Sequence, residues 1–129
     1  MADKILIIDD EKDMRVYLTT LFKKAGYIVE TAENGHAGIE KARISPPDLI
    51  TLDILMPKKS GLRTYRELRN APETSKIPIV ILTGLAQKTD FFPDELASLP
   101  APNAVCEKPI DRKEFLECVS EVLSDRDQE

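Results

Sequence analysis

Long apolar runs are absent from this chain of 129 residues. A membrane-spanning helix needs roughly 20 consecutive apolar residues, and no run in the sequence approaches that length. The N-terminus also lacks the pattern of a secretory signal peptide, because acidic Asp3 precedes only a very short apolar run. We therefore expect a cytoplasmic protein that makes no contact with a membrane.

A basic surface and a cysteine motif are missing as well. The net charge of −5 at pH 7 disfavours direct binding to nucleic acid, which needs a basic surface. Cys106 and Cys118 are the two cysteines and do not have CxxC spacing. We interpret them as reduced thiols of the core, with a disulfide or a metal site as the alternative. His36 is the single histidine and is interpreted as a surface residue.

The composition is that of one ordinary soluble domain. Hydrophobic residues make up 42% of the chain and charged residues 32%, and 129 residues are enough to enclose a substantial core. The sequence shows no internal repeat and no low-complexity linker. We predict one domain over residues 1–124, followed by a polar tail over residues 125–129.

Apolar runs typical of strands alternate with segments of helical spacing along the whole chain. Strands that are buried on both faces appear as continuous β-branched and leucine runs. Five such runs alternating with helices predict a parallel sheet with helices on both of its faces. The predicted strands cover residues 4–8, 27–31, 48–52, 77–82 and 104–107, and the predicted helices include 37–44, 60–70 and one that begins after Asp111.

Polar side chains follow four of these five strands at the point where each strand ends. Asp9 and Asp10 follow the first, Asp53 the third, Thr83 the fourth, and Lys108 the fifth. The carboxyl ends of parallel strands share one edge of a sheet, which is where such folds bind ligands. We therefore expect three acids, a hydroxyl and a lysine to meet there.

Three clustered carboxylates need a cation or raised pKa values, because like charges about 4 Å apart repel by roughly 4 kcal/mol at an effective dielectric of 20. Mg²⁺ favours hard oxygen ligands of this kind and often bridges carboxylates to phosphate oxygens. A carboxylate can also act as the nucleophile toward a phosphoryl group. We expect Asp53 to be paired with a metal ion and with Lys108, and to be the residue that is modified.

In this order, the residues resemble the receiver domain of two-component response regulators over nearly the whole chain. The resemblance implies a flavodoxin-like, doubly wound α/β fold, with a five-stranded parallel sheet in the order 2-1-3-4-5 and five helices. Each match is weak alone, but together and each near a strand end they are specific. The matching residues are Asp9-Asp10, Asp53 followed by Met56-Pro57 and Gly61, Thr83, and Lys108-Pro109.

The resemblance also implies a role for each acid of the site. Asp53 matches the phosphoacceptor of the family. Asp9 and Asp10 match Mg²⁺ ligands, with Asp53 and the backbone carbonyl of Leu55 completing the protein's share of the metal site. Glu11 is interpreted as a solvated residue or one that favours the helix dipole, and not as a ligand.

Two further residues match family positions that act on the phosphoryl group. Thr83 resembles the switch hydroxyl that bonds to the acyl phosphate. Lys108 resembles the lysine that pairs with a phosphate oxygen, and the resemblance implies a cis peptide bond between Lys108 and Pro109, although X-Pro bonds in general are mostly trans.

The function implied is that of a phosphoacceptor switch in a two-component phosphorelay. Such a protein accepts a phosphoryl group from a sensor histidine kinase or a histidine phosphotransfer protein and passes a conformational signal to a downstream partner or output domain. It is not an enzyme toward an external substrate, because it catalyses only its own phosphorylation and dephosphorylation. Both a stand-alone receiver and a receiver from a longer regulator fit the sequence.

Two other classes of protein share part of this pattern. A pseudo-receiver that serves only as a protein-binding module usually lacks the acidic pair or the lysine, and both are present here. A Mg²⁺-dependent phosphatase of the haloacid dehalogenase type carries a second acid two residues after its nucleophile, where this chain has Leu55. The residues therefore favour the phosphoacceptor over both alternatives.

Several positions depart from the family pattern. Val105 stands where the family often has an aromatic residue, so the usual partner of the Thr83 switch is missing. Prolines interrupt the segment Gly84–Asn103, and we expect the fourth of the five helices, within it, to be short or irregular. That segment is also our candidate for passing the signal on. Apolar Leu55 and Leu85 predict a long-lived acyl phosphate, because neither can orient an attacking water by hydrogen bonding.

Overall fold

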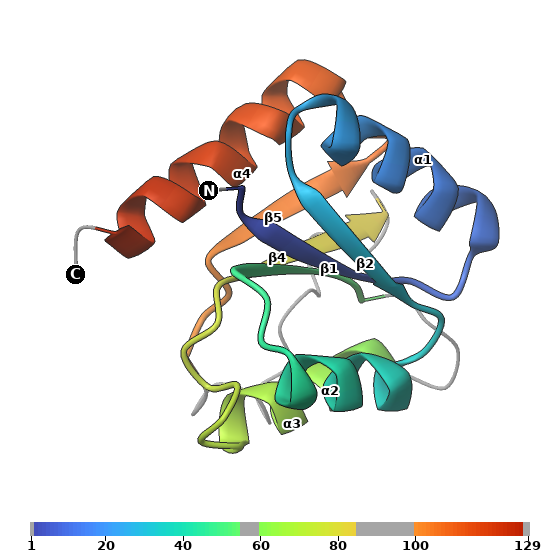
Figure 1. The fold of residues 1–129 in the computed structure, drawn as a ribbon. Coiled ribbons are helices and arrows are strands. Elements are labelled where there is room, and N and C mark those ends of the chain that lie inside the picture. Colours follow the sequence, from blue (N-terminus) through green and yellow to red (C-terminus); the bar gives the residue numbers. More distant parts are fainter. Residues whose placement is uncertain (1, 55–59, 85–99, 128–129) are drawn as a thin grey trace.

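The computed structural model describes residues 2–54, 60–84 and 100–127 (Figure 1). Within them, strands and helices alternate along the chain, as the apolar pattern predicts. The strands are β1 (Lys4–Ile8), β2 (Ile28–Ala32), β3 (Leu49–Asp53), β4 (Ile79–Gly84) and β5 (Ala104–Lys108), and the helices are α1 (Lys12–Lys24), α2 (Gly35–Ile44), α3 (Ser60–Asn70) and α4 (Arg112–Asp127).

The five strands form one parallel sheet in the order β2-β1-β3-β4-β5, which confirms the predicted fold class and strand order. Helices α1 and α4 cover one face of this sheet, and α2 and α3 cover the other (Figure 1). The described residues hold four helices. The fifth predicted helix, expected around residues 93–99, lies outside them, as do Leu55 and Leu85.

Side chains of each central strand alternate between two apolar cores, which is why the strands are apolar throughout. Ile5 and Ile7 of β1 point toward α1 and α4, whereas Leu6 and Ile8 point toward α2 and α3. The first core includes Leu18 and Phe22 of α1 with Phe115 and Val119 of α4, and the second includes Tyr65 and Leu68 of α3.

The ends of the helices are fixed by local hydrogen bonds and by one glycine. Asn34 caps α2 by accepting a hydrogen bond from the Ala37 N–H at 2.8 Å, and Asp111 caps α4 by accepting one from the Glu114 N–H at 3.0 Å. Gly26 follows α1 with a φ of 97°, a left-handed conformation that glycine adopts without strain.

Four of the five strands differ from their predicted bounds by one or two residues, and two of these differences have a clear local cause. Strand β2 begins at Ile28 and not at Tyr27, because the Tyr27 N–H donates to the Phe22 carbonyl and completes the end of α1. Strand β4 covers 79–84 and not 77–82, because Ile77 belongs to a turn that its N–H closes on the Thr74 carbonyl.

Helix α4 also continues further than predicted, through residues 125–127 of the expected polar tail. Arg126 gives this extension its long-range contacts. Its guanidinium lies 3.1 Å from Asp48 Oδ1 and 3.5 Å from Asp3 Oδ1, so the last turn of the helix is attached to the opposite end of the sheet from the predicted site. None of the helices within the described ranges combines the length and the apolar character that a bilayer crossing requires.

Candidate functional site

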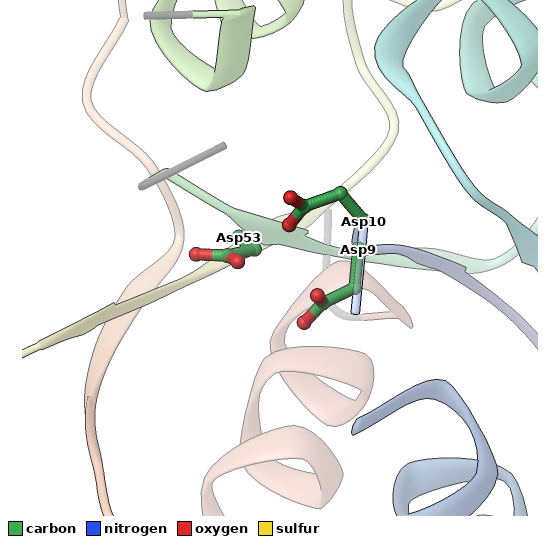
Figure 2. A group of neighbouring side chains, drawn as sticks. All are labelled: Asp9, Asp10 and Asp53. Atoms are coloured by element: carbon green, nitrogen blue, oxygen red, sulfur yellow. The ribbon is translucent and has the colours of Figure 1, made fainter. Parts of the chain in front are cut away.

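Three acids lie together where β1 and β3 end. The two strands are parallel neighbours and Ile8 pairs with Leu52, so the residues that follow Ile8 come to lie beside Asp53. Asp9, Asp10 and Asp53 each offer a carboxylate oxygen, and these three oxygens lie within 4.8 Å of one another. Figure 2 shows the three side chains pointing to the same side from the ends of the two strands. The predicted acidic cluster is therefore present.

Burial makes this cluster unusual. The Asp9 residue is 1% exposed and Asp53 is 2% exposed, whereas Asp10 is exposed. Acids are almost never fully buried unless they are paired, because removing a carboxylate from water is costly. Two buried acids side by side add mutual repulsion to that cost. A positive charge at this position would offset both effects.

The two carboxylate oxygens of Asp9 have different surroundings. Oδ1 accepts a hydrogen bond from the Glu11 N–H at 2.9 Å, whereas the buried Oδ2 has no hydrogen-bond partner. The pKa of Asp9 is raised from 3.8 to about 6, mainly by burial and also by the charge of Asp53, against the opposite effects of the Glu11 N–H and the Lys108 ammonium. Asp9 is therefore a carboxylate with one oxygen available to a cation.

One lysine approaches three of the site's carboxylates. Lys108 Nζ lies 3.4 Å from Asp53 Oδ2, 3.8 Å from Asp9 Oδ2 and 3.8 Å from Glu11 Oε1. The lysine ends β5 and its peptide bond to Pro109 is cis, which confirms the expected isomer. The partnership between Asp53 and Lys108 that the sequence led us to expect is present in the structure.

Thr83 is the last of the predicted site residues and lies on β4, the strand next to β3. It is fully buried in β4, one residue beyond Leu82, which pairs with Asp53. Its hydroxyl donates to the Gly84 carbonyl at 3.4 Å, the long limit for such a bond. A hydroxyl held this weakly can turn toward a new acceptor at little cost.

Two residues contribute to the site in ways that we did not predict. Arg15 donates a hydrogen bond from Nη1 to the Asp9 carbonyl at 2.8 Å and so holds the turn that leads out of β1. Glu11 adds a third carboxylate to Lys108, although its side chain is 67% exposed. Glu11 is the N-cap of α1 and Arg15 lies in its first turn, so both follow closely on Asp9 in the sequence, and this was the available signal.

The donor set fits a hard divalent cation. Asp9, Asp10 and Asp53 supply carboxylate oxygens from two adjacent strand ends. Oδ2 of Asp9 accepts no hydrogen bond and is the kind of buried atom that a metal ion satisfies. The carbonyl of Leu55, expected as a further ligand, lies outside the described residues. Magnesium is the cation that such oxygen ligands suit when phosphate is the partner.

A family model described as "Response regulator receiver domain" matches residues 5–120. The chain belongs to the response regulator receiver family. Members of this family are signalling modules of two-component systems, they act with histidine kinases or phosphotransfer proteins, and they bind Mg²⁺ at an acidic pocket. The acidic cluster of this receiver lies at the corresponding edge of the sheet.

Individual relatives agree with the family model. The receiver is 35% identical over 121 residues to Protein PilH of Pseudomonas aeruginosa, covering 94% of this chain and 98% of that protein. It is 32% identical over 126 residues to Protein Rrf1 of Nitratidesulfovibrio vulgaris, covering 96% and 85%. Its fold matches the chemotaxis protein CheY4 of Vibrio cholerae with a TM-score of 0.79 and 25% identity, covering 95% and 99%.

Proposed function

We propose that this receiver is the phosphoacceptor switch of a two-component phosphorelay, with Asp53 as the residue that is phosphorylated. The receiver unit extends to the end of α4 at Asp127, beyond the predicted limit at residue 124, and works in the cytoplasm. The observation that carries the proposal is the placement of Asp53, a buried carboxylate with the Lys108 ammonium at 3.4 Å and two further acids beside it.

The chemical step is a displacement at phosphorus. A carboxylate oxygen of Asp53 forms a bond to the phosphorus atom, the bond from phosphorus to the histidine nitrogen of the donor protein breaks, and the imidazole keeps the electron pair. Phosphoryl transfer of this kind depends mainly on positioning and on neutralising charge at the phosphoryl oxygens. A buried site favours it, because charges interact more strongly where water is excluded.

Lys108 and Thr83 would receive the new phosphoryl group. The ammonium already lies near Oδ2 of Asp53, so a phosphoryl oxygen bound there falls within reach of a charge-assisted hydrogen bond. The Thr83 hydroxyl can exchange its long bond to Gly84 for one to phosphate. This exchange changes the geometry of β4 at its last residues and is the first step of a signal.

Mg²⁺ would be held by Asp9, Asp10 and Asp53 and would neutralise charge on the transferring phosphoryl group. Asp9 contributes the oxygen that accepts no hydrogen bond, and Asp10 contributes from the exposed side of the cluster. The metal and Lys108 together give the incoming dianion two cationic partners. No external substrate is turned over in this scheme, so the receiver modifies only itself.

Labelling with acetyl phosphate tests this proposal directly. We expect Mg²⁺-dependent incorporation of one phosphoryl group, located on Asp53 by mass spectrometry after borohydride reduction of the acyl phosphate. Asp53→Asn should keep the fold and lose the label, because an amide is a poor nucleophile of nearly the same shape. Asp125→Asn, an exposed acid on α4, is the matched control and should be labelled like the wild type.

Two results would contradict the proposal. Label on another residue, or labelling of Asp53→Asn at the wild-type rate, would remove Asp53 as the acceptor. A wild-type chain that takes up no phosphoryl group with Mg²⁺ present would favour a pseudo-receiver that only binds proteins.

A further inference from the structure

Two cysteines far from the acidic cluster in sequence meet between β5 and α4. The Sγ atoms of Cys106 and Cys118 lie 3.7 Å apart, one on the strand and the other on the helix. Both are free thiols and both are partly exposed. Thiols that are close in space, reduced and accessible form a pair that can be oxidised together.

A hollow of about 500 Å³ lies beside the two thiols and is lined by both of them. It gives a small molecule access to the sulfur atoms and gives their side chains room to rotate. Glu107, Asp111 and Glu114 also line it, and none of the described lining residues is basic. This acidic lining disfavours an anionic reagent and favours a neutral or cationic one.

We propose that Cys106 and Cys118 form a redox modification site, at which a neutral or cationic low-molecular-weight disulfide oxidises the two thiols to one intramolecular disulfide between β5 and α4. This site is separate from the phosphoacceptor, and the proposal does not depend on Asp53 being phosphorylated.

The reaction is two successive thiol–disulfide exchanges. The Cys118 thiolate attacks the small disulfide, forms a mixed disulfide and releases one small thiolate. Cys106 then loses its proton, attacks Sγ of Cys118 and releases the second. Two protein thiols and one small disulfide become one protein disulfide and two small thiols. Cys106 acts second because burial, assisted by Cys118, raises the pKa of its thiol to about 12, so it is a poor first nucleophile.

The geometry requires only a local adjustment. A disulfide bond is about 2.05 Å long, so the sulfur atoms must approach by roughly 1.7 Å from their separation of 3.7 Å. Rotation of the two side chains toward one another is the movement that would close this gap. The bond would fix β5 to α4 two residues before Lys108, on the strand that carries the ammonium of the acidic site.

The test compares folded and unfolded chains in a neutral redox couple. The full chain is equilibrated with mixtures of 2-hydroxyethyl disulfide and 2-mercaptoethanol, with and without urea. The exchange is then quenched in acid, the remaining thiols are alkylated, and the products are identified by mass spectrometry. We expect both thiols to be lost together, independently of protein concentration. The effective concentration of the thiol pair should be at least about tenfold higher in the folded chain, which corresponds to about 1.4 kcal/mol of added stability for the oxidised fold.

Three further measurements separate this proposal from simple thiol reactivity. Cys106→Ala and Cys118→Ala should each give only mixed disulfides. Cationic cystamine should oxidise the folded wild type faster than anionic oxidised glutathione. An effective concentration in the folded chain at or below that in urea, or covalent dimers in place of the intramolecular bond, would overturn the proposal. None of these measurements involves phosphorylation, so a negative result for the two cysteines would not affect the proposed role of Asp53.

Discussion

The ammonium of Lys108 lies 3.4 Å from Oδ2 of Asp53 and 3.8 Å from Oδ2 of Asp9, two carboxylates that are both buried. The single positive charge of Lys108 thus lies next to two negative charges, and the lysine side chain is partly exposed. The acids are left with more negative charge than the lysine can balance. Burial is the main cause of the raised pKa of Asp9, the neighbouring charge of Asp53 adds to it, and the excess of negative charge makes the site suitable for a metal ion.

Removing the ammonium should slow phosphorylation. Lys108→Ala deprives a phosphoryl oxygen of a charge-assisted hydrogen bond, an interaction of about 1.5–3 kcal/mol, so we expect the rate of labelling by acetyl phosphate to fall roughly 10- to 100-fold. Lys113→Ala removes an exposed lysine of α4 and should leave the rate unchanged. Equal rates for Lys108→Ala and the wild type would show that this lysine does not contact the phosphoryl group.

Mg²⁺ should stabilise the fold by binding to the acidic cluster. At 100 times its Kd, a ligand that binds only the native state adds about 2.7 kcal/mol to the free energy of unfolding, which thermal melting detects as a higher Tm. Asp10→Ala should abolish most of this shift, and Asp125→Ala should not. Sodium chloride at matched ionic strength controls for screening. If Asp10→Ala responds to Mg²⁺ as the wild type does, the ion binds elsewhere.

The stability of the metal-free chain should depend on pH through Asp9. Its pKa is raised to about 6 in the folded chain, compared with 3.8 for an ordinary aspartate, so folding favours its protonated form. The contribution of Asp9 to the free energy of unfolding is therefore fully present below pH 4, falls as the pH rises from 4 to 6, and is lost above pH 6. The loss is about 2–3 kcal/mol, at 1.36 kcal/mol per pKa unit.

Asp9→Asn isolates that contribution, since its amide oxygen can still accept from the Glu11 N–H. In EDTA, urea unfolding should show this variant to be more stable than the wild type at pH 7.5, with a much smaller difference at pH 4. Asp125→Asn should track the wild type at both values. A difference between Asp9→Asn and the wild type that is the same at pH 4 and pH 7.5 would falsify the titration of Asp9.

A second prediction about stability concerns Asn103, which precedes β5. Its Oδ1 accepts hydrogen bonds from Arg69 Nη2 and from the Ile79 N–H, each at 3.0 Å. Asn103→Ala leaves both donors without this acceptor, and we expect a loss of about 2–3 kcal/mol in the free energy of unfolding. Asn70→Ala, at an exposed position at the end of α3, should cost well under 1 kcal/mol. Equal losses from the two variants would contradict this assignment.

The acidic site could be predicted because its residues follow directly from strand ends. Continuous apolar runs mark buried strands, and parallel strands end at one edge, so the meeting of Asp9, Asp53 and Lys108 needed no knowledge of side-chain geometry. The first and last residues of the strands were harder to predict. An apolar run shows which residues are buried, but a strand begins only where the backbone N–H groups can bond to the neighbouring strand. The Tyr27 N–H already donates to the Phe22 carbonyl at the end of α1, so β2 begins one residue later.

Contacts between distant segments away from the carboxyl ends of the strands could not be predicted. Nothing local indicates that Arg126 reaches Asp3 and Asp48, yet these pairs accompany the extension of α4 beyond the predicted end. The same holds for Cys106 and Cys118. Their sequence spacing matches no motif, and only the packing of α4 on β5 brings their sulfur atoms together.

The two bonds accepted by Asn103 also have a mechanical consequence. Just before it, the Pro100 carbonyl accepts a hydrogen bond from the Tyr65 hydroxyl, and the Asn103 N–H itself donates to the Ile79 carbonyl, so two hydrogen bonds to α3 and two to β4 hold the chain that enters β5. These bonds oppose a displacement of the backbone where it enters β5. Lys108 ends the same strand, so the bonds at the start of β5 help to hold its ammonium beside Asp53.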